Sequence, residues 1–130
     1  MVVYNERWIT IRWDESLKAS WAEAKAYAEG EELRAGYNAM LELCRQKRNS
    51  RYLADARNLA PISQTDQRWL NEEWFPQILA AGVRFMAIVM PKSAVARLSA
   101  RQILSTIDTI TIVTNHFDDI EAARAWLRTV

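Results

Sequence analysis

Phe85-Met86-Ala87-Ile88-Val89-Met90 is a continuous apolar run that ends at Pro91. Strands of a parallel sheet are covered by helices on both faces and therefore have this uniformly apolar character, whereas half-buried strands alternate. Helix-like patterns lie on both sides of the run in the sequence. The run therefore predicts a buried central strand, and it decides the fold class.

Two strands are predicted near the N-terminus. Apolar and polar residues alternate over 8–13, as in a half-buried strand. The stretch 17–21 also alternates, although residues 17–28 are rich in helix formers. We interpret 17–21 as the second strand of a hairpin, with a helix starting later.

Two helices and another strand are predicted before the apolar run. A 3.6-residue apolar period predicts a helix over about 31–48, followed by a short strand over 51–55. Ser63 predicts the capped start of the second helix, and Gly82 its end. Pro76 lies inside this helix and cannot donate to the carbonyl four residues earlier, so we expect a kink there.

The chain after the apolar run predicts helix, strand and helix. Ser93 can cap a helix that reaches about Leu104, with a break expected near Ser99. Thr and β-branched residues over 108–114 predict a strand. Asp118 is the expected cap of the last helix, with Phe117 packing on its first turn.

The resulting order is β-β-α-β-α-β-α-β-α. Strands separated by helices imply right-handed crossovers, so we predict an α/β fold with a mixed, largely parallel central sheet, helices on both faces and an N-terminal β-hairpin. The chain has 130 residues, only three Gly and three Pro, and no linker or repeat. We therefore expect a single domain over residues 1–130.

Composition excludes several classes of function. Seventeen Lys and Arg against 16 Asp and Glu leave a net charge of +1, which gives no basic field for nucleic acid. One Cys forms no internal disulfide and suits a reducing compartment, so we expect a cytoplasmic protein. No signal-peptide pattern and no apolar run near the roughly 20 residues of a membrane span is present.

Reactive constellations are also missing from the sequence. Three glycines build neither a dinucleotide-binding fingerprint nor a phosphate loop. A metal site is not predicted, since only His116 and Cys44 offer nitrogen or sulfur ligands, and we expect no cofactor. Cys44 lies on an apolar helix stripe and is predicted to be an inert core thiol. We interpret His116 as a structural loop residue.

Tryptophan is abundant, with six residues. Four fall on faces predicted to be buried, while Trp8 and Trp69 fall outside them. Exposed Trp is favoured where a partner covers it, so our hypothesis is that both contribute to a homodimer interface. The alternative is that each rests at the sheet edge under a loop. The four predicted core residues are Trp13, Trp21, Trp74 and Trp126.

The carboxyl ends of the parallel strands are the expected ligand edge, because open α/β sheets collect ligands there. Helix N-termini at this edge favour anions. The helix starting at Ser93 has no acid in its first turn and has Lys92 beside it, so a small anion is expected there, with Arg57 as the second cation. A solvated loop edge is the alternative. The candidate ligand-binding residues are Asp55, Arg57, Asn58, Lys92, Ser93 and His116.

A family resemblance rests on Tyr52-Leu53-Ala54-Asp55-Ala56-Arg57-Asn58-Leu59, on Ile62-Ser63 followed by Asp66-Gln67 and Trp69-Leu70, on Trp74-Phe75-Pro76, on 80–89 and on 117–127. Together these stretches resemble the short bacterial STAS-like, or anti-sigma-factor-antagonist-like, proteins. The resemblance implies an α/β fold like that of STAS and CRAL-TRIO domains, used for protein partnering or for holding nucleotides or lipids. It also supports the strand assignment of 17–21.

The resemblance does not extend to a phosphorylation switch. In the anti-sigma-factor antagonists, a phosphorylatable Ser follows an Asp at the end of the corresponding strand. Here Asp55 matches, but Ala56 and Arg57 stand where that Ser would be. Ser63 is the nearest hydroxyl, and we interpret it as a helix cap.

Three functions follow from these observations. The first is a cytoplasmic bacterial regulatory module that acts through protein contacts, with a partner or as a homodimer, and without catalysis. The second is a binder of a small anionic or amphipathic ligand, nucleotide-like or lipid-like, at the carboxyl edge. The third is an enzyme that uses Asp55 or His116 as a base.

Overall fold

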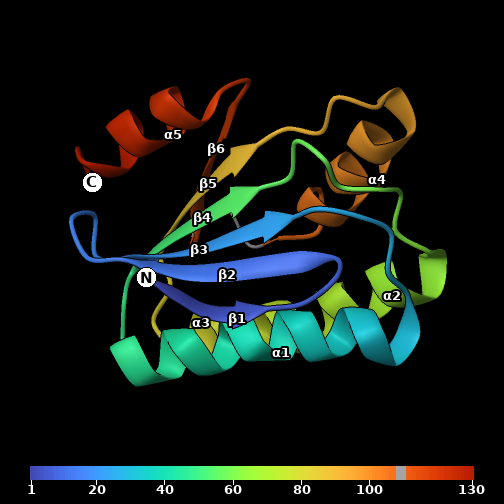
Figure 1. Cartoon of the computed structure of the whole chain (residues 1–130), viewed down its shortest axis with the longest axis horizontal. Coiled ribbons are helices and arrows are strands. Elements are labelled where there is room, and N and C mark those ends of the chain that lie inside the picture. Colours follow the sequence, from blue (N-terminus) through green and yellow to red (C-terminus); the bar gives the residue numbers. More distant parts are fainter. Residues whose placement is uncertain (108–110) are drawn as a thin grey trace.

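A computed structural model describes residues 1–107 and 111–130. In this part of the chain, six strands form one sheet in sequence order (Figure 1). The first strand pairs antiparallel with the second and the second antiparallel with the third, whereas the third to sixth strands are mutually parallel. The strands are β1 (Val2–Asn5), β2 (Ile9–Asp14), β3 (Ala19–Ala24), β4 (Arg51–Asp55), β5 (Phe85–Val89) and β6 (Val113–Phe117).

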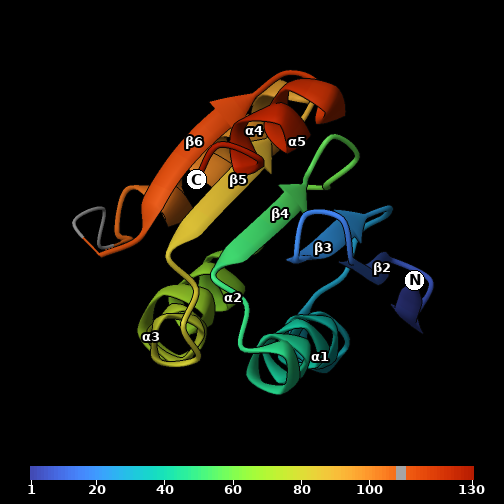
Figure 2. The ribbon, with the colours of Figure 1, turned by 90° about the vertical axis from the view of Figure 1, so that its left-hand side faces the viewer.

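Helices cover both faces of the sheet, as predicted for an α/β fold. Figures 1 and 2 show α1 and α3 on one side and α5 on the other. Buried residues of α4 pack in the same core cluster as those of α1. The helices are α1 (Gly30–Lys47), α2 (Gln64–Trp69), the π-helix η1 (Leu70–Trp74), α3 (Phe75–Ala80), α4 (Ala94–Leu104) and α5 (Ile120–Leu127).

The N-terminal hairpin is confirmed, with two differences. The predicted strand 17–21 is found at Ala19–Ala24, because Leu17 and Lys18 belong to the turn. The Leu17 N–H donates to Asp14 Oδ1 at 3.1 Å, and Lys18 has a left-handed φ of 52°. Strand β1 was not predicted, since its four residues are too few for a periodic signal.

Pro76 is accommodated by the π-helix that precedes it. The Phe75 N–H donates to the Leu70 carbonyl five residues earlier, which widens the turn where Pro76 has no N–H to offer. The predicted cap at the start of this region is confirmed, because Ser63 Oγ accepts from the Asp66 N–H at 3.1 Å. Gly82 ends it with a φ of 110°, a conformation that favours glycine.

The C-terminal third requires three corrections. Helix α4 is continuous, because Ser99 is buried and its Oγ accepts from the Ile62 N–H at 3.3 Å instead of breaking the helix. Residues 108–110 of the predicted strand lie outside the described residues, and 111–112 form a turn, so the strand is Val113–Phe117. Asp119 rather than Asp118 caps α5, accepting from the Ala122 N–H at 2.8 Å.

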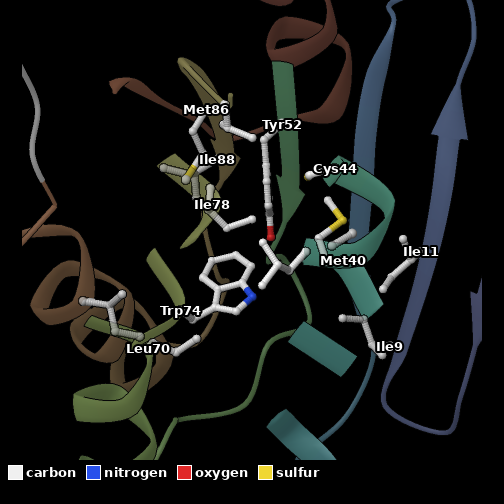
Figure 3. Close-up of a cluster of buried hydrophobic side chains, with 14 of the residues drawn as sticks. Ile9, Ile11, Met40, Cys44, Tyr52, Leu70, Trp74, Ile78, Met86 and Ile88 are labelled. Atoms are coloured by element: carbon white, nitrogen blue, oxygen red, sulfur yellow. The ribbon is translucent and has the colours of Figure 1, made fainter. Parts of the chain in front are cut away.

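The larger core lies between the sheet and α1, α3 and α4. Trp74 is fully buried at its centre (Figure 3), with ring centroids 4.9 Å from Tyr37 and Phe75 and 6.0 Å from Tyr52. Burial of each such side chain stabilises the fold by roughly 1.5–3 kcal/mol. Cys44 lies in this core, as predicted.

A second, smaller core lies under α5. The strands that contribute side chains to the larger core contribute their alternate residues to this one, because successive side chains of a strand point to opposite faces. Phe117 and Trp126 pack here with centroids 5.9 Å apart, so the ring contact of Phe117 is with the last turn of α5 and not with the first turn, where the sequence predicted it. Its fully buried members are Leu17, Ala19, Leu53, Ala87, Val89, Ala123 and Leu127.

Candidate functional site

The carboxyl ends of β4 and β5 bring two of the candidate segments together. Asp55 and Val89 are in register, and the Ala56 N–H donates to the Val89 carbonyl at 2.9 Å. Beyond the strands, the Lys92 N–H donates to the Arg57 carbonyl at 3.2 Å. The sequence prediction that these loops meet at one edge is therefore correct.

Asp55 and Arg57 bind each other at this edge. Arg57 donates through Nε to Asp55 Oδ1 at 2.9 Å and through Nη2 to Oδ2 at 2.8 Å. The carboxylate is buried, whereas about a third of the Arg57 side chain is exposed. Hydrogen bonding to Asp55 is the largest cause of the raised pKa of the Arg57 guanidinium. The cation expected to bind an anion is thus already neutralised.

The N-terminus of α4 is capped by its own chain. Ser93 Oγ accepts from the Ala96 N–H at 3.3 Å, so this hydroxyl serves the helix end, as predicted. Lys92 is exposed beside it. An acid approaches from a distant segment, because Asp118 lies 3.9 Å from Arg97 of the first helical turns. The helix end therefore has more negative charge nearby than its local sequence indicates.

His116 and Asp55 lie on opposite faces of the sheet. His116 is in register with Ile88, which faces the larger core, and Asp55 is in register with Val89, which faces α5. His116 is exposed and belongs to β6 rather than to a loop, which corrects its predicted placement. The two bases considered for an enzyme therefore do not converge. Asn58 is exposed in the turn after β4.

Cys44 has the environment of an unreactive thiol. It is fully buried, and its Sγ lies 3.2 Å from Ser20 Oγ. Burial raises the pKa of Cys44 to about 11, so the thiol stays protonated at neutral pH. Within residues 1–107 and 111–130, no group of three His, Cys, Asp or Glu side chains is arranged to hold a metal.

The two interface candidates are not exposed aromatic side chains. The expectation that Trp8 is exposed is wrong, because the residue precedes β2 and does not follow the alternation of that strand. It is 1% exposed, packs against Gly36 and donates from Nε1 to the Glu32 carbonyl at 3.2 Å. Trp69 is half-buried, with the Arg34 guanidinium 5.3 Å from its ring centroid.

The other four Trp residues follow their predictions in part. Trp13 and Trp74 are buried. Trp21 and Trp126 are half-buried at the border of the smaller core. Two guanidinium groups cover Trp21. That of Arg124 lies 5.5 Å from the ring centroid, and that of Arg12, the neighbour of Trp21 across β2 and β3, lies 5.3 Å from it. These cations explain how an indole at the edge of a core is shielded from water.

A cavity of about 80 Å³ lies in the larger core under β4, and a neighbouring one of about 40 Å³ shares part of its wall. The shared wall is apolar except for two phenol hydroxyls, those of Tyr37 and Tyr52. Burial raises the pKa of Tyr37 to about 12, so the hydroxyl is neutral. The sequence contains no signal for this cavity, since its walls come from six separate helices and strands and from the loop after β4.

A second feature missed by sequence reasoning is a polar groove of about 550 Å³ between the α2–η1 segment and α4. Carboxamide side chains recur on one wall at helical spacing, at 64, 67 and 71. That spacing is visible in the sequence and places these groups on one face of a helix. The partner wall on α4 is not predictable from it.

Helix α4 is apolar on two sides. Ala96, Ala100 and Ile103 are buried against the larger core, while Val95 and Leu98 are 61% and 56% exposed. The outward face of α4 is therefore a surface that the fold itself does not use.

A family model described as SpoIIAA-like matches residues 9–128. Comparisons with curated proteins and with solved structures found no match. Among the helices of the described residues, none combines the length and the apolar character that crossing a membrane requires.

Proposed function

Because the chain belongs to the SpoIIAA-like family, we propose that it is a bacterial cytoplasmic regulatory module that binds a protein partner, or a second copy of itself, and performs no catalysis. The family suggests a module of the anti-sigma-factor-antagonist type. We further propose that this module acts through contacts with other proteins.

The carboxyl edge gives little support to anion binding or catalysis. An incoming anion would have to compete with Asp55, which is buried and already accepts from Nε and Nη2 of Arg57. Of the remaining candidates, Asn58, Lys92 and His116 are exposed, and no bonded group orients their side chains among the described residues. A reaction needs groups held in fixed geometry, which this edge does not provide.

The observation that carries the proposal is the outward face of α4. Val95 and Leu98 are spaced by three residues, so they lie on one side of the helix. Each leaves more than half of its accessible surface in water. Covering apolar surface contributes roughly 25 cal/mol per Å², and a protein partner would supply that cover.

The test compares the double variant Val95→Ser, Leu98→Ser with a control, Val2→Ser, Val113→Ser, in which two other exposed valines are changed. Native mass spectrometry of freshly purified chain measures what remains bound. We expect the wild type to retain a stoichiometric protein, or to have twice the 15.0 kDa chain mass. The α4 variant should lose that species at least tenfold, and the control should keep it.

Two results would contradict the proposal. One is a wild type that is monomeric and carries no protein. The other is a complex that both double variants retain equally, because the partner would then lie elsewhere. Circular dichroism spectra of all variants control for unfolding, which is not expected from changes of exposed side chains.

A second candidate function is the binding of a small amphipathic ligand, and the apolar cavity under β4 favours it over the carboxyl edge. The two tyrosine hydroxyls have no hydrogen-bond partner among the described residues, so a ligand could bond to them. The volume of about 80 Å³ lies below the roughly 150 Å³ of a cavity that holds benzene. A ligand would therefore have to enlarge the cavity.

The probe for this function is 1-anilinonaphthalene-8-sulfonate, an anionic amphipathic dye whose fluorescence rises in apolar sites. Ala100→Leu fills the cavity, and Ala94→Leu adds the same side chain to the exposed side of α4. We expect saturable dye binding that Ala100→Leu removes and Ala94→Leu leaves. No saturable binding, or equal binding by both variants, excludes the cavity as the site.

A further inference from the structure

The polar groove between α2–η1 and α4 has features that the fold does not require. Its walls carry four carboxamide groups, from Gln64, Gln67, Asn71 and Gln102. Arg68 and Glu72 also line the groove, and their opposite charges cancel. A neutral groove lined with carboxamides does not match an anion, a nucleic acid or a metal ion.

Most of these carboxamides are not used by the protein. Gln67 donates to the Ile62 carbonyl at 2.8 Å. Within the described part of the chain, no other group bonds to the carboxamides of Gln64, Asn71 or Gln102. The Oδ1 atom of Asn71 is buried without a hydrogen-bond partner. Leaving such an atom unpaired usually destabilises a protein, so its presence needs a reason.

Asn71 lies in the π-helix η1. A π-turn changes the direction of the side chains that it carries, and such turns occur frequently at functional sites. Pro76 explains why a wide turn is present here, but it does not explain why a residue of this turn has a buried polar atom. Once the Asn71 side chain rotates to present Oδ1 to the groove, a ligand with a hydrogen-bond donor would satisfy that atom.

Apolar surface continues the groove at both ends. At one end, a cavity of about 180 Å³ shares Asn71 and Thr106 with the groove and is lined by apolar groups, among them Leu79 and Ile112. Toward the other end, Val95 lies seven residues before Gln102 and therefore on the same side of α4. The surface is thus polar in the middle and apolar at each end.

The groove and the cavity beside Leu79 together have a length that suits an extended chain. Gln64 and Leu79 are 15 residues apart along the α2–η1–α3 segment, which spans about 22 Å at the rise of a helix. An extended polypeptide covers that length with about seven residues. A carboxamide presents an acceptor oxygen and an NH2 donor side by side, so it can pair with the N–H and the C=O of one residue of an extended chain, which point to the same side.

We propose that this groove binds an extended polypeptide segment of a partner protein, with the carboxamides of Gln64, Asn71 and Gln102 bonded to its main chain and an apolar side chain of the segment in the cavity beside Leu79. The inference rests on the proposed function and names the site and the form of the partner. The exposed face of Val95 and Leu98 then continues the same contact along α4.

Selection from a phage-displayed library of random 12-residue peptides on the immobilised full chain tests the groove. Enriched peptides are synthesised, and their Kd is measured by fluorescence anisotropy. Asn71→Leu and Gln102→Leu each remove one carboxamide from the groove and replace it with an apolar side chain of similar size. Gln46→Leu makes the same change on the exposed side of α1 and is the matched control.

We expect enriched peptides with at least one apolar residue, which bind both groove variants at least tenfold more weakly than the wild type and the control. Methylation of single main-chain nitrogens in the peptide should also weaken binding at least tenfold. We also expect Asn71→Leu to unfold at a higher urea concentration than the wild type, because it removes an unpaired buried atom.

The outcomes separate this inference from the proposed function. No enriched peptide, or enriched peptides that bind all variants equally, overturns the groove as the site, and the α4 face is still tested by its own double variant. Tenfold loss with Asn71→Leu but no effect of main-chain methylation overturns the extended main-chain mode. A lower urea midpoint for Asn71→Leu would contradict the argument that Asn71 is kept for binding.

Discussion

The contact between Gly36 and Trp8 leads to a prediction opposite in sign to the usual effect of alanine in a helix. Gly36 lies in the middle of α1, where Ala normally stabilises by about 1 kcal/mol relative to Gly. A Cβ at this position would lie 3.0 Å from Trp8 Cε2, closer still to Cζ2, and 3.1 Å from Ile9 Cγ2. Carbon atoms that are not bonded are ordinarily separated by about 3.5–4.0 Å.

Gly36→Ala therefore requires the indole to move. The ring has no room, because Trp8 is 1% exposed and its Nε1 donates to the Glu32 carbonyl. Overpacking of this kind costs about 1–3 kcal/mol, and loss of the hydrogen bond adds about 1 kcal/mol. After subtraction of the helix-propensity gain, we expect Gly36→Ala to lower the free energy of unfolding by about 2 kcal/mol.

Urea unfolding followed by far-ultraviolet circular dichroism measures this change. The same substitution in a Trp8→Leu background is the control, because the smaller side chain leaves space for the Cβ. There, Gly36→Ala should stabilise the chain by up to about 1 kcal/mol, as helix propensity alone predicts. A higher urea midpoint for Gly36→Ala in the wild-type background, or an equal change in both backgrounds, would refute the reasoning.

Two further predictions concern titratable groups. Arg57→Met should lower the free energy of unfolding by about 3 kcal/mol, because it leaves the buried Asp55 carboxylate unpaired. Asp55→Asn should lower it by only about 1 kcal/mol, because the partly exposed guanidinium stays hydrated. Equal losses for the two variants in urea unfolding would contradict this asymmetry. The pKa of Cys44 is about 11 in the folded chain, against an ordinary value of 9.0. Between these pH values the folded chain therefore holds a Cys44 proton that the unfolded chain has lost, so the contribution of Cys44 to stability should be fully present below pH 9 and fall by about 2–3 kcal/mol up to pH 11, in addition to the decline from the buried tyrosines, whose pKa values are also raised. In Cys44→Ala that contribution should be missing, and a decline of unchanged size in this variant would assign it to other groups.

Local patterns predicted the elements that depend on near neighbours. The strand Arg51–Asp55 and the cap at Ser63 agree with the structure, because a short apolar run and a Ser hydroxyl act within a few residues. The continuous α4 was missed at Ser99, since the group that bonds to Ser99 comes from a segment 37 residues away. Edge strand β1 was missed because its four residues show no period.

The candidate site was predictable only in part. The meeting of the Arg57 and Lys92 loops follows from parallel strands, whose carboxyl ends share one edge. The ion pair between Arg57 and Asp55 could not be predicted from the sequence, because two side chains so close along the chain could equally point apart. The polar groove needs two helices to form, and only one of its walls shows a pattern in the sequence.

By itself, the sequence determined the α/β class, the hairpin, the parallel order and the family, because periodicity and helix caps are properties of segments a few residues long. Only the tertiary structure decided which side chains remain free. Trp8 is buried because a glycine of α1 faces it, and Asn71 Oδ1 is unpaired because no described group reaches it. Burial and partnership of a side chain depend on contacts between distant segments, and those contacts exist only once the chain is folded.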